Sequence, residues 1–135
     1  MDASWRQQRV LDLLDALVAG DRDTVKSYLA PTCSIVFPGF AATGPDGVDE
    51  LYAVLDVAFD GVPTKSYDTW TLDDSSAVVT GSLFGRFADG LVMDGTRYVD
   101  WFRFDADGRI THWLVWNDLA ILVASAAPAA AAAAS

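Results

Sequence analysis

Apolar positions in the first half of the chain recur at the three- and four-residue spacing of amphipathic helices. Glycine, proline and acidic residues mark the ends of these segments, as in the AGD sequence between the first two. The predicted elements are helices at residues 4–19, about 21–30 and about 46–59, with a short strand, CSIVFPG, at residues 33–39 between the second and third helices. The order in this half is therefore helix, helix, strand, helix.

From Thr64 onward the apolar spacing shortens to two residues, which is typical of strands with one buried face. The strand-like runs cover residues 64–72, 76–88, 91–104 and 109–117, separated by the turn sequences DDS, DG and DADG. Asp-Gly pairs are strong hairpin signals because glycine tolerates the positive φ of tight turns. The pattern predicts a four-stranded antiparallel meander and an α+β fold, a cone in which N-terminal helices pack on a strongly curved antiparallel sheet and enclose a pocket.

One acid, Asp100, lies inside a run of aromatic and β-branched residues, RYVDWFRF. A two-residue turn at Asp89-Gly90 places Asp100 opposite Val79, and a four-residue DADG loop places it opposite Trp113. Both counts put Asp100 on the strand face that also holds Val79, Gly81, Leu83, Thr96, Tyr98, Phe102, Trp113, Val115 and Asn117. The opposite face carries arginines and is therefore the outer one, so Asp100 is predicted to be buried.

A buried carboxyl group has a raised pKa, and in its protonated form it donates a hydrogen bond or acts as a general acid. The alternative is structural, with Asp100 hydrogen-bonded to Tyr98 or to a helix terminus. Tyr98 is either a second donor beside Asp100 or a wall residue whose hydroxyl is satisfied locally. Asn117 either orients a ligand carbonyl or completes the strand end, and Asp118 is predicted to cap the following helix.

Length and composition restrict the function classes. The 135 residues suffice for one domain, predicted over residues 1–126, and the alanine-rich residues 127–135 are predicted to be a disordered tail. The formal charge of −10 argues against nucleic acid and acidic membranes as partners. A single cysteine, Cys33, and a single histidine, His112, offer no metal-ligand spacing, so neither a metal nor a cofactor is expected. The first residues lack the pattern of a signal peptide, which indicates a cytoplasmic protein.

The succession AGDRDTVKSYLAP, CSIVFPG, GVDELYAVL and VDWFRFDADGRITHW resembles the nuclear-transport-factor-2-like superfamily over nearly the whole chain. It is most similar to the SnoaL-like polyketide cyclase and ketosteroid isomerase branches. The resemblance implies an isomerase, cyclase or dehydratase without a cofactor, and it matches Asp100 to the protonated acid of the isomerase oxyanion hole. The positions that it matches to the isomerase base and phenol, near Phe37 and Leu13, are apolar here.

We expect an enzyme that moves a proton on a small apolar, carbonyl-bearing molecule, with Asp100, Tyr98 and Asn117 as catalytic residues. The predicted substrate-binding wall consists of Phe37, Phe40, Tyr52, Leu55, Phe59, Val79, Leu83, Phe102, Trp113 and Val115. The alternative is a small-molecule binding or assembly protein of the same fold, because no second inward carboxylate or histidine supplies a base. The outer sheet face is predicted to form a homodimer through an apolar patch of Trp101, His112, Leu114 and Trp116.

Overall fold

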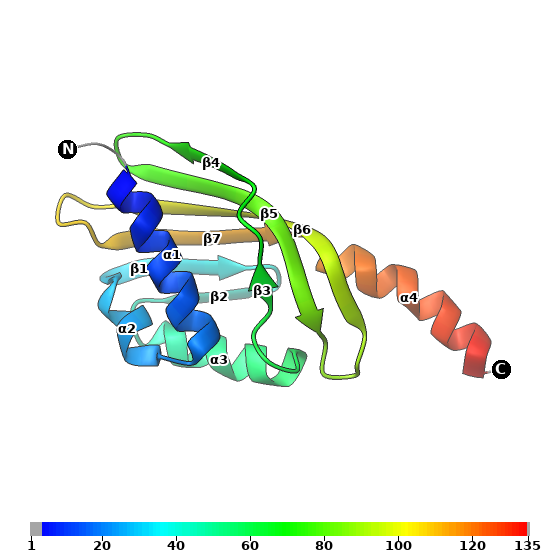
Figure 1. The fold of residues 1–135 in the computed structure, drawn as a ribbon. Helices are drawn as coiled ribbons and strands as arrows, with labels where there is room; N and C mark the ends of the chain where they lie inside the picture. Colours follow the sequence, from blue (N-terminus) through cyan, green and yellow to red (C-terminus); the bar gives the residue numbers. More distant parts are fainter. Residues whose placement is uncertain (1–3, 135) are drawn as a thin grey trace.

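The computed structural model describes residues 4–134, with side chains as far as residue 126. Its elements are α1 (Ser4–Ala19), α2 (Arg22–Ser27), β1 (Leu29–Phe37), β2 (Phe40–Thr43), α3 (Gly47–Ala58), β3 (Thr64–Lys65), β4 (Thr69–Leu72), β5 (Ser76–Arg86), β6 (Val92–Phe104), β7 (Ile110–Asn117) and α4 (Leu119–Ala134). The strands form one curled sheet in the order β2-β1-β7-β6-β5-β3, and β4 also pairs with β5. Helices α1, α2 and α3 lie on one face of this sheet (Figure 1), which confirms the α+β class predicted from the sequence.

The core lies between these helices and the inner face of the sheet. Helix α1 buries Val10, Leu13, Leu14 and Leu17, which recur at the three- and four-residue spacing that predicted the helix. Helix α3 contributes Val48, Leu51, Tyr52 and Leu55 in the same way. Gly20, with φ at 74°, ends the first helix in a conformation that other residues rarely adopt. The sequence therefore predicts both the extent of α1 and the face that it buries.

The sheet is larger than the predicted meander and is not wholly antiparallel. Strand β1 runs parallel to β7, with Ile35 opposite Trp113, and the unpredicted strand β2 folds back on β1. Strand β1 also begins at Leu29, inside the segment that was predicted to continue the second helix. The helix ends early because the Ile110 N–H group donates to Tyr28 O and holds this segment against β7. Pairing with a distant strand here overrides the local helical spacing.

The predicted position of Asp100 opposite Val79 is confirmed, although two deviations cancel to produce it. The turn between β5 and β6 contains three residues instead of two, because the Phe87 N–H group donates to Leu91 O. A bulge at Gly95, where φ is 98°, then inserts one further residue into β6. Without this bulge, Asp100 would face outward, because a shift of one residue exchanges the two faces of a strand.

The predicted pairing between β6 and β7 was wrong by two residues. Asp100 lies opposite Val115 rather than Trp113, and Tyr98 lies opposite Asn117 rather than Val115. The loop between β6 and β7 contains three residues instead of four, which shifts the pairing by one residue. An irregularity in the pairing of the two strands shifts it by one more. A shift of two residues returns each side chain to its own face, so the predicted inner face is still correct.

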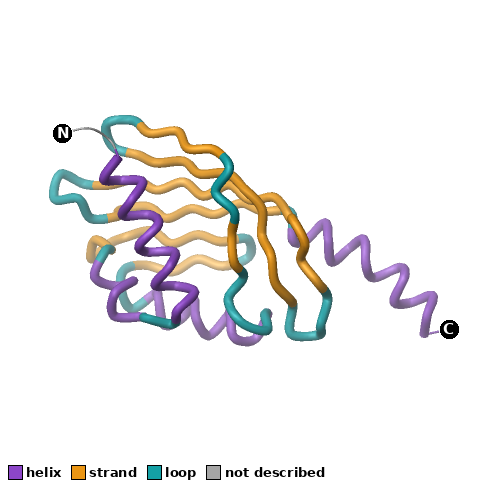
Figure 2. Tube along the Cα trace, viewed as in Figure 1, coloured by secondary structure: helices purple, strands orange, loops and turns teal. Residues whose placement is uncertain are grey.

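Helix α4 begins at the end of β7 and projects away from the body of the molecule, as Figure 2 shows. Leu119 and Leu122 of its first turns pack against the core, whereas Ile121 and Val123 are exposed. The helix extends to Ala134; the predicted disorder of the tail concerns residues 127–135, whose side chains lie outside the described part of the chain. Among the described residues, no helix combines the length and the apolarity needed to cross a membrane.

Candidate functional site

A small cavity, here called the inner cavity, lies between helices α1 and α3 and the inner face of the sheet. Its wall is mostly apolar and includes Leu17, Phe37, Leu55, Phe59, Leu83 and Val115. Three polar residues complete the wall: Lys65 of β3, Tyr98 of β6 and Asn117 of β7. The cavity volume is about 60 Å³, whereas ligand pockets usually enclose roughly 300 Å³ or more. The cavity therefore admits only a small molecule unless its wall side chains move.

The pair Lys65–Asp100 is the polar centre of the inner cavity. The Lys65 amino group contacts Asp100 Oδ2, with 12% of the lysine side chain and 0% of the aspartate side chain exposed. Lys65 Nζ also lies 4.6 Å from the centroid of the Tyr98 ring, within range of a cation–π interaction. The second carboxylate oxygen, Asp100 Oδ1, is buried and has no hydrogen-bond partner among the described residues. Lys65 faces the cavity and Asp100 lies behind it, so Asp100 reaches a ligand through Lys65.

Burial raises the pKa values of two groups at this site, Asp100 and Tyr98. It raises the pKa of the Asp100 carboxyl above its ordinary value, and the adjacent Lys65 opposes this rise. Burial also raises the pKa of the Tyr98 hydroxyl, and the nearby Asp100 carboxylate adds to that shift. Tyr98 therefore stays protonated, and proton chemistry at the cavity depends on the Lys65–Asp100 pair. The described residues contain no cluster of ligating side chains that would hold a metal ion.

Tyr98 supports the strand that carries Lys65. Its hydroxyl donates to Ser66 O at 2.6 Å, so its donor is used within the protein and only its oxygen lone pairs can serve a ligand. Ser66 O reaches this position because Gly81 of β5 has no side chain: a Cβ atom at Gly81 would lie 2.1 Å from that oxygen. The local satisfaction of the hydroxyl agrees with the structural interpretation of Tyr98, while its ring still forms part of the cavity wall.

Asn117 occupies the boundary between the inner cavity and helix α4. Its Oδ1 atom accepts a hydrogen bond from the Leu119 N–H group at 3.2 Å. Asp118, the predicted helix cap, instead forms an ion pair with Arg97 at 3.3 Å. The amide NH₂ group of Asn117 is then the donor that this residue can offer to a ligand.

The predicted wall residues divide between the cavity and the core. Those that line the inner cavity are Phe37, Leu55, Phe59, Leu83 and Val115. Those that do not line it are Phe40, Tyr52, Val79, Phe102 and Trp113. Phe102 and Trp113 are fully buried, and their rings stack with centroids 6.1 Å apart in the core. Tyr52 is held by a hydrogen bond from its hydroxyl to Leu17 O at 2.7 Å.

The sequence did not indicate Lys65 because its orientation depends on an irregular strand. Trp70 of β4 lies opposite Val79, and the same register continued to β3 would place Ser66 opposite Leu83. The observed pairing is shifted by one residue, so that Lys65 lies opposite Leu83 on the inner face. Regular alternation from β4 would have turned Lys65 outward. No local sequence signal marks this shift.

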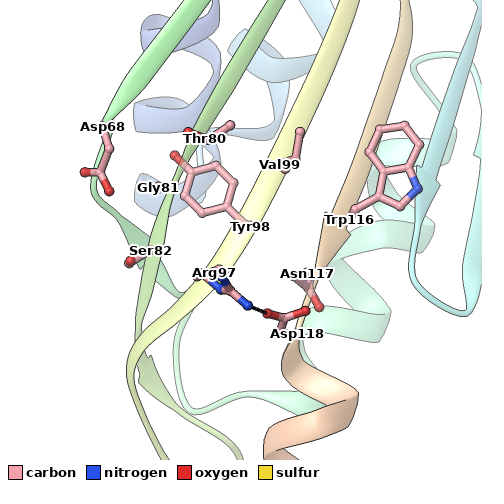
Figure 3. Close-up of a pocket in the computed structure, with 10 residues that line it drawn as sticks. All are labelled: Asp68, Thr80, Gly81, Ser82, Arg97, Tyr98, Val99, Trp116, Asn117 and Asp118. Atoms are coloured by element: carbon pink, nitrogen blue, oxygen red, sulfur yellow. Dashed lines mark ion pairs between the residues drawn. The ribbon is translucent and has the colours of Figure 1, made fainter.

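The outer face of the sheet carries a second, open groove, here called the outer groove (Figure 3). Its lining includes Thr80, Ser82, Arg97, Val99, Trp116 and Asp118. The Trp116 side chain is 54% exposed beside the Arg97–Asp118 ion pair drawn in Figure 3. Elsewhere on the same face, the rings of Trp101 and His112 lie 5.7 Å apart. The predicted apolar patch is thus on the outer face, away from the Lys65–Asp100 pair.

Comparison with known proteins gives the family of this chain. Residues 10–113 match the SnoaL-like domain, and the chain therefore belongs to the SnoaL-like family. Among curated protein sequences, none matches the chain.

Solved structures of nuclear-transport-factor-2-like proteins share the fold. One of unknown function from Burkholderia pseudomallei is 21% identical, with 91% of this chain and 96% of that chain covered and a TM-score of 0.77. A protein from Xanthomonas campestris proposed to be a polyketide cyclase is 16% identical, with 90% and 96% covered and a TM-score of 0.77. TerC, co-crystallised with polyporic acid, is 16% identical, with 86% and 93% covered and a TM-score of 0.74. At these sequence identities the likeness shows a shared fold.

Proposed function

We propose that this protein binds a small, uncharged, carbonyl-bearing molecule in the inner cavity and moves a proton on it without a cofactor, as an isomerase, cyclase or dehydratase does. The observation that carries this proposal is the Lys65–Asp100 pair, which is largely shielded from water and has its lysine in the wall of a mostly apolar cavity. Buried ionisable groups at a cavity wall are expensive to maintain in a fold, and they concentrate at functional sites.

The charge of the site favours a neutral ligand. Lys65 and Asp100 together carry no net charge, and most of the surrounding wall is apolar. An anionic ligand would add an unbalanced charge in this low-dielectric space, at a high cost in free energy. A ketone avoids this cost, and its oxygen can accept hydrogen bonds from Lys65 and from the Asn117 amide. When a proton leaves the neighbouring carbon, negative charge develops on that oxygen and the Lys65 ammonium stabilises it.

The proposed roles of Asp100 and Tyr98 differ from those predicted by the sequence. Lys65, not Asp100, meets the substrate, while Asp100 holds the lysine in place and exchanges a proton with it. Tyr98 contributes its ring beneath the lysine, and Asn117 contributes an amide donor. The apolar body of the ligand would pack against the phenylalanine and leucine side chains of the wall.

A binding protein without catalysis is the second candidate. Among the described residues that line the inner cavity, none has a carboxylate or imidazole side chain. Removing a proton from carbon needs a base, and in the catalytic proposal the Lys65–Asp100 pair must supply it. The two candidates share the ligand class and differ only in whether a proton moves.

Hydrogen–deuterium exchange on cyclohexanone distinguishes the two candidates. The protein is incubated with cyclohexanone in deuterated buffer, and NMR follows loss of the protons next to the carbonyl. Catalysis predicts exchange above the protein-free rate, with a loss of about 100-fold in Lys65→Met, since one oxyanion donor contributes that much or more. Lys26→Met is the matched control, because Lys26 pairs with Asp49 on the surface.

Binding is measured separately by saturation-transfer NMR with the same ketone. Binding with exchange at the background rate would identify a binding protein and refute the catalytic proposal. Absence of binding would refute both candidates for this ligand class.

We further propose that the outer groove is a homodimer surface. The supporting features are the exposure of Trp116 at 54% and of Val99 at 37%, on a sheet face that the three core helices do not cover. Burying large aromatic side chains of this kind is a common source of association energy.

A further inference from the structure

We infer that Lys65 acts as a nucleophile, condensing with the carbonyl carbon of the ligand to form an iminium ion, with Asp100 as the acid and base of that condensation. This inference rests on the proposed function, because it names the bond that a carbonyl ligand forms in the inner cavity.

The surroundings of the two lysines of this chain differ in the way that such chemistry requires. Lys65 is 12% exposed, lines an apolar cavity and contacts a carboxyl group. Lys26 lies on the surface, 2.7 Å from Asp49, whose side chain is 48% exposed. A lysine in an apolar pocket is the type that forms Schiff bases with carbonyl substrates.

Proton transfer within the Lys65–Asp100 ion pair gives the free amine that the attack needs. A buried carboxylate is normally stabilised at both oxygens, yet among the described residues only Lys65 meets Asp100, at Oδ2, and Oδ1 has no donor. A carboxyl group this poorly solvated and in direct contact with the amino group is placed to take that proton. The raised pKa of the Asp100 carboxyl points in the same direction.

The condensation balances without any further reactant. The Nζ lone pair of Lys65 forms a bond to the carbonyl carbon, the π electrons move to the oxygen, and that oxygen takes the Asp100 proton. The nitrogen returns one proton to the Asp100 carboxylate, which then protonates the hydroxyl group so that it leaves as water. The products are an iminium ion on Lys65, a carboxylate on Asp100 and one water molecule, so a charged pair again occupies the site.

This chemistry supplies the base that the cavity wall lacks. An iminium ion withdraws electrons from the neighbouring carbon and makes its proton more acidic than in the free ketone. In this scheme the Asp100 carboxylate, formed in the condensation beside the nitrogen, accepts that proton. A second carboxylate is then unnecessary for an isomerase or cyclase at this site.

Reductive trapping tests the inference. The full chain is incubated with cyclohexanone and sodium cyanoborohydride, which converts an iminium ion into a stable cyclohexyl amine, and peptide mass spectrometry quantifies modification at Lys65, Lys26 and the N-terminal amine. We expect Lys65 to be modified faster than Lys26, although it is the less exposed lysine. The preference should vanish in urea, where both lysines are solvated alike.

Two variants test the separate roles of Lys65 and Asp100. Lys65→Arg keeps a cation beside Asp100 but cannot form the iminium ion, so cyclohexyl modification at this position should be lost. Asp100→Asn should slow trapping at Lys65 by about 100-fold, the lower range of a general acid–base contribution, and leave trapping at Lys26 unchanged.

Modification of Lys65 no faster than that of Lys26 in the folded protein overturns the inference. If saturation-transfer NMR shows cyclohexanone bound in that case, or exchange still depends on Lys65, the proposed function survives and Lys65 is only a hydrogen-bond donor. Unchanged trapping in Asp100→Asn would overturn the role of Asp100.

Discussion

Replacing Lys65 by methionine should destabilise the fold by an amount that grows with pH. Methionine retains an apolar stem, but it leaves Asp100, whose side chain is 0% exposed, without a counter-charge. A buried carboxylate without a partner avoids its charge by binding a proton. At pH 7, protonating a carboxyl whose ordinary pKa is about 3.9 costs about 1.36 kcal/mol per pH unit, or about 4 kcal/mol. At pH 5 the same protonation costs about 1.5 kcal/mol.

Proton binding sets the direction of this pH dependence. Since burial raises the pKa of Asp100, the folded state binds more protons than the unfolded state between the two pKa values. The contribution of Asp100 protonation to stability is fully present below the pKa of this carboxyl in the unfolded state. It is lost as pH rises through the pKa of the carboxyl in the folded state. In the wild type, Lys65 limits the rise in the pKa of Asp100, so the Lys65→Met variant loses stability over a wider pH range.

Urea unfolding followed by tryptophan fluorescence measures the effect at about pH 5 and about pH 7. The stability difference between Lys65→Met and wild type should increase by about 2 to 3 kcal/mol between these conditions. Lys26→Met, which removes the partly exposed pair with Asp49, should change stability little at either pH. If Lys65→Met costs no more than Lys26→Met near neutral pH, or the same at both pH values, the argument for a buried Asp100 that depends on Lys65 is wrong.

Four further predictions address the strand, the acid, the interface and the tail. Gly81→Ala should lower the melting temperature and weaken cyclohexanone binding, because its Cβ atom would lie 2.1 Å from Ser66 O; unchanged melting and binding would contradict the close approach of Ser66 to Gly81. Asp100→Leu should slow ketone exchange by about 100-fold or more, as should Asp100→Asn, whereas retention of exchange in the asparagine variant would leave Asp100 only a hydrogen-bonding role. Light scattering should find a dimer that Trp116→Arg dissociates, and a monomeric wild type would rule the interface out. Deleting residues 127–135 should leave melting and exchange unchanged, and a loss of several degrees would show that the tail docks.

Local chemistry alone predicts much of this fold. The spacing of apolar residues gives the extent of α1 and its buried face, and Gly20 gives its end. The Asp-Gly turns and the alternation along β6 predict Asp100 on the inner face, but the β5–β6 count is correct only because the bulge at Gly95 offsets the longer turn, and the β6–β7 register was wrong by two residues. The face is insensitive to the two-residue error because alternate residues of a strand point the same way. The family resemblance rests on these same segments, and the SnoaL-like match confirms it.

Tertiary structure alone decides what surrounds Asp100. Lys65, 35 residues earlier in the chain, reaches the carboxyl group only because the pairing with β5 shifts by one residue between β3 and β4. Gly81 permits the close approach of Ser66 that accompanies this shift. The parallel pairing of β1 with β7 and the position of β2 likewise depend on contacts between distant segments. A one-residue shift reverses the face of every side chain beyond it, and its position is set by neighbouring strands rather than by the residues of the shifted strand.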